Sequence, residues 1–242
     1  MILSYSKRSG VRLANAYHKI VSVEARGCAT ALTRYLNLMC NLYKMRSSAA
    51  EVAQWSDAMT APGLNFADTI YPGYQGLVIA SGQLRTMTWG FPVRLKHMKP
   101  TSKPKPVTNA RNDKLRTSFW KPSFEARRCL IPATAWAEPQ GETRKMTCTW
   151  HSLPNCDVFA IAGLWRPTLE WGDAYTMVMV DSCEQMAEVH DRMPLILKRG
   201  HWAQWNDGSA TEAFDLVQTW CDPLVIDRTD QRWGAADLPR LL

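Results

Sequence analysis

Short apolar runs of four to eight residues, separated by turn residues, fill the chain from Cys40 onward. Runs of this length that contain many β-branched and aromatic residues predict β-strands. The predicted strands cover residues 76–80, 84–91, 129–136, 145–151, 158–165, 175–181, 194–198 and 224–227. Helical spacing predicts short helices over residues 49–59, 119–128, 201–206 and 211–220, the last opened by Thr211 with Glu212 in its first turn.

The helices are too few to supply crossovers between parallel strands. We therefore expect an α+β fold, with a mainly antiparallel sheet curled into a β-barrel-like core and short flanking helices. Residues 99–106, which contain three prolines, predict an extended exposed loop. Residues 1–38 show no sustained period and contain almost no acid. We expect residues 1–39 to be an extension outside a single domain of residues 40–242, either because Met39 is the true start or because the segment is removed.

Composition limits the class of protein. With 242 residues, 46% hydrophobic and 21% charged, the chain can bury a large core, which excludes disorder as its overall state. No apolar run reaches the roughly 18 to 20 residues that span a bilayer, so we expect a soluble protein with no membrane partner. The seven cysteines form no C-x-x-C pair, so we expect neither a disulfide framework nor a metal site, and no cofactor. A reducing cytoplasm is the simplest compartment.

The positive charge is concentrated in one stretch. The whole chain has 29 basic and 22 acidic residues, but residues 85–128 hold twelve basic residues against two acidic ones. A basic stretch of this kind favours phosphate binding, because its side chains neutralise phosphates and release counterions. A solvated basic loop is the equally simple alternative.

Cys40 is the first candidate for chemistry. Most single cysteines are small buried hydrophobic residues. Cys40 follows Met39 at the point where the composition changes, so a chain that starts there and loses its methionine carries an α-amine and a thiol on adjacent carbons. Such a 1,2-aminothiol condenses with an aldehyde to an imine, and its sulfur then closes a five-membered thiazolidine ring.

Three further clusters contain side chains suited to binding or proton transfer. Asn109 and Arg111 lie in the basic stretch, and Arg can bind a phosphate with two hydrogen bonds. Glu138 ends an apolar run, where partial burial would raise its pKa and suit it to acid or base catalysis. His190 precedes Asp191 and Arg192, either of which can fix its tautomer. Polar turns and solvated strand ends are the structural alternatives for all three.

In this order, five strings of residues resemble the SOS response-associated peptidase (SRAP) family over residues 39 to about 227. The strings are Met39-Cys40, Trp89-Gly90 with Phe91-Pro92, Asn109-Ala110-Arg111, Arg128-Cys129-Leu130-Ile131-Pro132 leading to Glu138, and His190-Asp191-Arg192-Met193-Pro194. Each string is weak evidence alone, but five in order are strong evidence. Members of that family shield abasic sites in single-stranded DNA by linking an N-terminal cysteine to the sugar aldehyde, and their fold is a β-barrel-like α+β domain.

The resemblance implies a role for each matching residue. Cys40 would be the crosslinking nucleophile, Asn109 would hold the opened sugar, Glu138 would act as acid or base in crosslinking and in removing residues ahead of the cysteine, and His190 would assist imine formation. Arg111 would bind a flanking phosphate, with Lys114 and Arg116 as further DNA contacts, and Trp89 would stack near a base. The implied partner is single-stranded DNA containing abasic sites, bound by a monomer that is cytoplasmic and, when on DNA, associated with a bacterial-type nucleoid.

Two other functions are compatible with the same residues. In one, an internal Cys40 attacks an amide of another protein with His190 as base, as in a cysteine peptidase. In the other, the basic stretch makes the chain a noncatalytic nucleic-acid binder. The start of the chain discriminates among them, because an internal Cys40 permits peptidase chemistry but forbids the thiazolidine.

Overall fold

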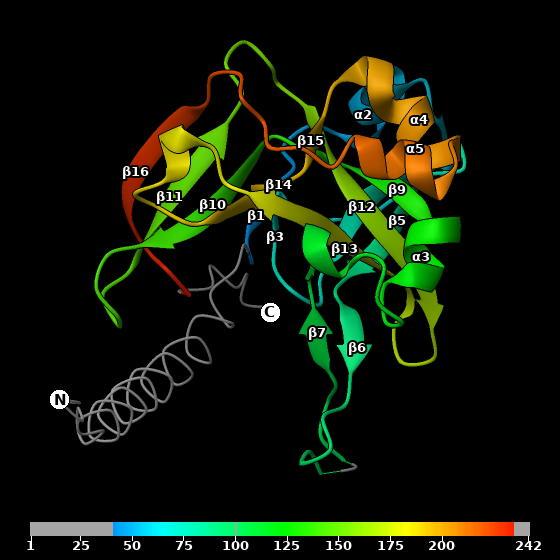
Figure 1. The fold of residues 1–242 in the computed structure, drawn as a ribbon, viewed down its shortest axis with the longest axis horizontal. Helices are drawn as coiled ribbons and strands as arrows, with labels where there is room; N and C mark the ends of the chain where they lie inside the picture. The colour runs from blue at the N-terminus through cyan, green and yellow to red at the C-terminus, as the bar shows by residue number, and fades with distance from the viewer. Residues whose placement is uncertain (1–40, 100, 235–242) are drawn as a thin grey trace, which may run out of the picture. The chain divides into compact units, whose positions relative to one another are not determined.

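A closed ring of five strands forms the centre of this computed structural model, which describes residues 41–99 and 101–234 (Figure 1). The ring order is β4 (Gln75–Ala80), β5 (Gln83–Trp89), β13 (Gly172–Asp181), β12 (Phe159–Thr168) and β9 (Arg128–Ala133). Neighbouring strands are antiparallel except β13 and β5, whose parallel pairing closes the ring. The expected α+β fold with a barrel-like core is confirmed.

All barrel strands except β5 are apolar along most of their length, because both of their faces are covered. In β4, five consecutive residues from Gly76 to Ala80 are buried, and all of β9 is buried. The largest buried side chains include Trp89 and Tyr175. A strand that is buried on both faces shows a continuous apolar run rather than an alternating pattern, which is why these runs are the clearest signal in the sequence.

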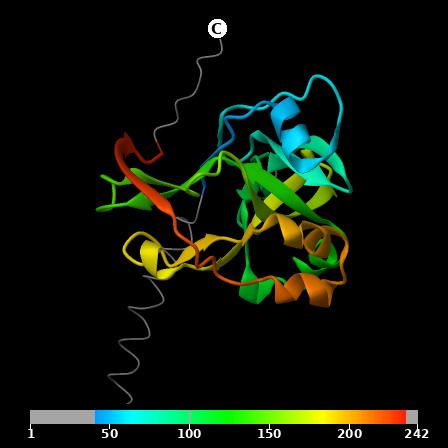
Figure 2. The same cartoon turned by 90° about the horizontal axis from the view of Figure 1, so that it is seen from above.

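A second, five-stranded antiparallel sheet lies beside the barrel (Figure 2). Its order is β16 (Val225–Arg232), β11 (Thr147–Ser152), β10 (Ala135–Gln140), β1 (Tyr43–Lys44) and β3 (Thr69–Ile70). The buried hydroxyls of Tyr43 in β1 and Tyr175 in β13 share a hydrogen bond that joins this sheet to the barrel. A Cβ atom on Gly76 would lie 2.2 Å or less from both hydroxyl oxygens, so only glycine leaves room for this pair.

Short helices flank the barrel. They are α2 (Ala49–Ser56), α3 (Lys121–Ala126), α4 (Trp202–Asp207) and α5 (Ala210–Asp215), with 3-10 turns η1 (Asn112–Lys114), η2 (Glu184–Met186) and η3 (Arg199–His201). All four expected helices are present in the described part of the chain, but the last begins and ends earlier than predicted. Ser209, rather than Thr211, is its N-cap, because Ser209 and Glu212 form a reciprocal capping box.

A two-stranded arm projects from the barrel between β5 and β8 (Asn109–Arg111). It consists of β6 (Phe91–Val93) and β7 (Lys105–Val107), which pair antiparallel. Gly90 turns the chain into the arm with φ +110°, and a Cβ atom there would lie 2.5 Å from Cβ of Pro106. The expected exposed loop is therefore shorter than residues 99–106, because its last two residues belong to β7.

Three predicted strands are each divided in the structure. The run 84–91 breaks at Gly90, between β5 and β6. The run 129–136 breaks at Thr134, so β9 belongs to the barrel and β10 to the second sheet. The N–H of Thr134 donates to the carbonyl of Lys44, 2.8 Å away, and this bond stabilises the corner. The run 194–198 corresponds to the end of β14 (Arg192–Pro194) and to β15 (Ile196–Leu197). A further short strand, β2 (Met59–Thr60), pairs with β5.

Candidate functional site

Asn109 lies on β8, which runs parallel to β13 with Asn109 opposite Met177. Its side-chain amide donates to the hydroxyl of Thr108 over 3.0 Å, and that hydroxyl donates to Oδ1 of Asn41 over 2.8 Å. Thr108 is almost fully buried, which protects this chain of bonds from water. The first residue after Cys40 is thus connected to Asn109 by two hydrogen bonds.

Glu138 lies on β10, in the second sheet, and is completely buried. The N–H of its neighbour Ala137 donates to the carbonyl of Leu42 over 3.0 Å. Asn41 therefore contacts Thr108, the residue just before the strand of Asn109, and Leu42 contacts the strand of Glu138. The two residues that follow Cys40 thus join the two segments that carry these candidate side chains.

His190 precedes β14, and its environment sets the position of its proton. The backbone N–H of Arg192 donates to Nδ1 of His190 over 3.0 Å. An Nδ1 that accepts a hydrogen bond carries no proton, so neutral His190 carries its proton on Nε2. Burial lowers the pKa of His190, although the carboxylate of Asp191, 3.2 Å from Nδ1, acts in the opposite direction.

Arg192 joins the loop of His190 to the region of Asn109. Its Nη1 atom lies 2.8 Å from Oδ1 of Asp181 at the end of β13 and donates to Oδ1 of Asn112, 3.0 Å away, just after β8. The side chain of Arg192 is mostly buried, at 16% exposure, whereas that of Asp181 is 72% exposed, so water still screens this ion pair. Asn109 and His190 are consequently supported by the same strand, β13.

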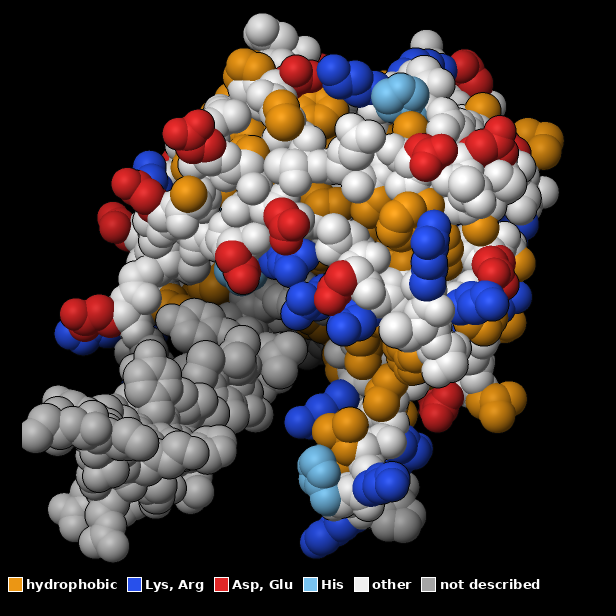
Figure 3. All heavy atoms as spheres, viewed as in Figure 1, with side chains coloured by type: hydrophobic (Ala, Val, Ile, Leu, Met, Phe, Trp, Pro, Cys, Tyr) orange, Lys and Arg blue, Asp and Glu red, His pale blue; other side chains and the backbone are white. Residues whose placement is uncertain are grey.

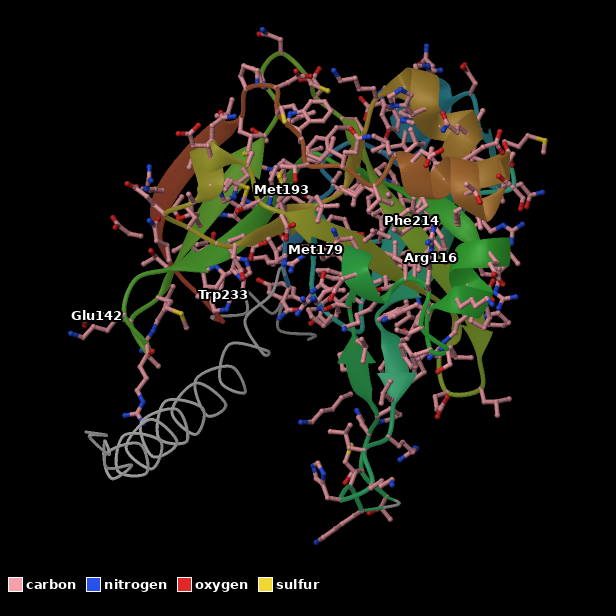
Figure 4. The ribbon with its side chains drawn as sticks, viewed as in Figure 1. Arg116, Glu142, Met179, Met193, Phe214 and Trp233 are labelled. Atoms are coloured by element: carbon pink, nitrogen blue, oxygen red, sulfur yellow. The ribbon has the colours of Figure 1, made fainter. Side chains whose placement is uncertain are left out.

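The predicted DNA contacts differ in how they are engaged. Arg111 forms a two-bond pair with Asp113, with Nε 3.0 Å from Oδ1 and Nη2 3.2 Å from Oδ2, and Nζ of Lys114 lies 3.4 Å from Oδ2 of the same carboxylate. The guanidinium of Arg116 lies over the ring of Phe214 in α5, 4.0 Å from its centroid (Figure 4). All three basic side chains remain partly or largely exposed.

The position of Trp89 does not support the expectation that it stacks near a base. Its side chain is 0% exposed, its indole N–H donates to the carbonyl of Thr108 over 3.3 Å, and the ring of Tyr43 packs against it at nearly a right angle. A ring without exposed surface has no face for a base. Trp89 instead supports the strand that leads into Asn109.

The links made by Asn41 and Thr108 went unrecognised in the sequence as parts of the site, whereas Arg192 was expected beside His190 but its bonds to Asp181 and Asn112 were not. Thr108 and Asn41 belong to no recognisable motif, and only their adjacency to Asn109 and Cys40 could have drawn attention to them. Cys40 itself lies outside the described residues. Within residues 41–99 and 101–234 no group of three or more His, Cys, Asp or Glu side chains is arranged to hold a metal ion. None of the helices in these same ranges is long and apolar enough to cross a membrane.

Comparison with curated proteins identifies relatives with a common description. A protein from Bacillus subtilis named abasic site processing protein YobE is 30% identical over 175 residues, which are 69% of this chain and 75% of that protein. Abasic site processing protein HMCES from Pongo abelii is 29% identical over 170 residues, 54% of this chain. The match spans only 48% of the Pongo protein, about half its length.

Solved structures share the fold. A protein from Bordetella bronchiseptica superimposes with a TM-score of 0.67 at 23% identity, over 78% of this chain and 99% of that one. A protein from Bacteroides thetaiotaomicron also gives 0.67, at 19% identity, over 78% and 91% of the two chains. The model of the family described as SOS response associated peptidase matches residues 39–230. The chain therefore belongs to the SRAP family.

Proposed function

We propose that this protein binds single-stranded DNA and forms a covalent thiazolidine with abasic sites through an N-terminal Cys40. The names of the relatives support abasic-site processing. The observation that carries the proposal is the position of Asn41 and Leu42, which are hydrogen-bonded to Thr108 and Ala137 respectively. Asn41 and Leu42 thereby join the segments that carry Asn109 and Glu138. The proposed reaction requires a nucleophile held close to these two side chains.

The proposed reaction needs no oxidant or reductant. The α-amine of Cys40 adds to the aldehyde carbon C1′ of the opened sugar, and the hemiaminal loses water to give an imine. The thiol Sγ then adds to the same carbon, and its proton passes to the imine nitrogen. One C–N and one C–S bond form at C1′, and one water molecule leaves.

The described side chains suit the proton transfers of this sequence. Neutral His190 would accept a proton from the α-ammonium group of Cys40 and, as the imidazolium, return it to the departing hydroxyl of the hemiaminal, so the imidazole is neutral before and after the step. Glu138 is the carboxyl group that would accept and return protons at the amine and thiol. The amide of Asn109 would hold the hydroxyl of the opened sugar, and Arg111 would bind the adjoining phosphate.

The same Glu138 would assist hydrolysis of the peptide bond before Cys40, which frees the amine when residues precede it. In this proposal residues 1–39 are an extension outside the mature domain, and the active form is a monomer in the cytoplasm that associates with the nucleoid on DNA. The proposed reaction is possible only if Cys40 is the first residue of the mature protein, because the thiazolidine requires a free amine on Cys40.

The test uses the protein expressed from Met1 and an oligonucleotide with one abasic site. Intact mass should show a chain that begins at Cys40, and the adduct should equal protein plus oligonucleotide minus one water. Cys40→Ser and Cys40→Ala should both lose the stable adduct, while an imine trapped by borohydride remains when the amine is free. A wild-type yield from Cys40→Ala, or full activity from protein that retains residues 1–39, would overturn the proposal.

A further inference from the structure

Phe119, which belongs to the basic stretch of residues 85–128, exposes part of its aromatic ring to solvent. The large hydrophobic side chains exposed in the described part of the chain are Met59, Leu95, Phe119, Leu169 and Val225, and Phe119 is the aromatic one among them. It is 38% exposed and lies in the turn between η1 and α3. Exposed aromatic rings within basic surfaces are the usual stacking sites for single-stranded nucleic acid.

The ring of Phe119 is held in place by its neighbours. The guanidinium of Arg166 lies 4.7 Å from the centroid of Phe119 and 4.1 Å from that of Phe91, so it contacts both rings. The nearly buried indole of Trp120 packs perpendicular to Phe119 with centroids 4.6 Å apart. A ring that is already ordered loses little conformational entropy when a ligand stacks on it.

The surroundings of Phe119 are positively charged. Arg116 and Lys121 lie on either side of it in the sequence, and residues 114–124 contain no acidic residue, while Lys121 pairs with Glu125 over 3.7 Å. Lys and Arg side chains follow the β6–β7 arm along the face seen in Figure 3. The basic residues of the arm are Arg94, Lys96, Lys99, Lys103 and Lys105. This charge favours a polyanion over an acidic or neutral partner.

The Phe119 ring is connected to the candidate site through the β6–β7 arm. Phe91, whose ring centroid is 6.4 Å from that of Phe119 and which also contacts Arg166, pairs with Val107 across the arm. Paired strands lie about 5 Å apart, and Val107 is two residues before Asn109. A strand whose opened sugar is held at Asn109 therefore needs only a short flank to reach Phe119.

We propose that Phe119, stacked with Arg166, binds a nucleobase that flanks the abasic nucleotide. This inference rests on the proposed function, because it assumes that single-stranded DNA is the ligand. The phosphates of the flank would contact Arg116 and the arm, and the base would cover the exposed part of the ring. Phe119 thus takes the stacking role that the buried Trp89 cannot fill.

The experiment measures the noncovalent affinity of the protein for two DNA single strands of equal length, both with a continuous sugar-phosphate backbone. One strand carries normal bases, and the other carries a tetrahydrofuran spacer in place of every base, so it keeps the phosphates but has no rings. The wild type should bind the first strand more tightly. Phe119→Leu should weaken binding to it about 5- to 150-fold, which corresponds to about 1–3 kcal/mol per stacked base.

Matched variants isolate the ring. Phe119→Leu should leave affinity for the spacer strand unchanged, and Phe119→Tyr should restore affinity for the base-containing strand. Leu169→Ala changes another exposed apolar residue, at the tip of the β12–β13 hairpin, and should bind both strands as the wild type does. A 2-aminopurine in the flank should lose fluorescence on binding to the wild type and to Phe119→Tyr but not to Phe119→Leu.

The outcomes separate this inference from the function on which it depends. If the wild type binds neither strand, the proposed function itself is wrong. If the wild type binds DNA and Phe119→Leu keeps the same preference for bases, only the stacking inference is overturned. The inference is also overturned if Phe119→Leu weakens binding to both strands equally and Phe119→Tyr does not restore the affinity. The ring would then support contacts to the DNA backbone rather than to a base.

Discussion

Arg128 and Trp205 are joined by a hydrogen bond from the guanidinium Nε of Arg128 to the carbonyl of Trp205. The indole of Trp205 in turn donates to the carbonyl of Cys129, 3.0 Å away. The remaining nitrogens of Arg128 donate to the carbonyls of Phe124, Glu125 and Gly208. A cation in the basic stretch is thus used to join α3, α4 and β9 rather than to contact a phosphate.

We predict that Arg128→Met lowers the free energy of unfolding by about 2–4 kcal/mol, because several buried carbonyls lose their donors. Arg128→Lys should recover little of this loss, since one ammonium cannot reach carbonyls spread around a planar guanidinium. Urea denaturation measures both changes. Binding of DNA by the folded variants should keep the salt dependence of the wild type, and a shallower dependence would show that Arg128 contacts phosphate after all.

Arg111 should contact one phosphate. We predict that Arg111→Ala reduces the slope of log affinity against log salt by about 0.7 for single-stranded DNA, the value for one neutralised phosphate. Lys145→Ala is the matched control, because Lys145 is 81% exposed on the β10–β11 hairpin and pairs only with Glu142. An unchanged slope in Arg111→Ala would mean that its pairing with Asp113 persists on DNA.

Glu138 should affect the rate of crosslinking rather than binding. We predict that Glu138→Gln slows adduct formation by about 10²-fold or more, the usual contribution of a general acid or base, while affinity for undamaged DNA stays near that of the wild type. A time course on an abasic oligonucleotide beside a binding titration separates the two quantities. If both fall together, Glu138 maintains the structure of the site and is not a proton carrier.

The rate should also report the protonation of His190. Burial lowers its pKa, so the neutral form with the proton on Nε2 predominates at pH 7. As the pH falls through that lowered pKa, protonation of Nδ1 breaks its bond to the N–H of Arg192, and we predict that the rate falls. His190→Gln should be slow and should lack this limb of the pH profile, whereas an identical limb in the variant would assign it to the α-amine of Cys40.

A buried histidine in the second sheet should make stability depend on pH. His151 is 0% exposed and stacks on Trp136 with centroids 5.1 Å apart, and burial lowers its pKa from 6.5 to about 4. The unfolded chain binds this proton more readily, so stability is complete above pH 6.5 and is lost as the pH falls toward 4. The loss approaches about 3 kcal/mol for a shift of this size.

The variant His151→Phe keeps a ring against Trp136 and removes the titration. The difference in unfolding free energy between wild type and variant should therefore change with pH between 7.5 and 4.5, with the wild type losing more on acidification. Urea denaturation at several pH values measures it. A constant difference would show that His151 is accessible to protons in the folded protein.

Much of the fold follows from the apolar runs, because strands buried on both faces leave a continuous pattern. The corner at Thr134 left no such signal, since it contains neither glycine nor proline next to the turn and is held by the carbonyl of Lys44, ninety residues away in the sequence. The start of α5 was misplaced for a local reason: both Ser209 and Thr211 are good caps, and the reciprocal bond with Glu212 selects Ser209.

The candidate site could be predicted only as a set of separate residues. Local strings indicated Asn109, Glu138 and His190, but the links through Thr108 and Arg192 depend on strands brought together by folding. The burial of individual side chains could not be predicted from the sequence either. Trp89 and Phe119 are both aromatic residues in one basic stretch, and only the folded barrel buries the first and leaves the second exposed.

The many partners of β13 have a dynamic consequence. This one strand pairs with β12, β5, β8 and β14. Because β13 is paired with four other strands, its amide protons exchange with solvent only when a large part of the domain opens. We therefore expect β13 to be among the slowest-exchanging segments. Because β8 and β14 both pair with this strand, the backbones of Asn109 and Arg192 should gain and lose protection together rather than as independent loops.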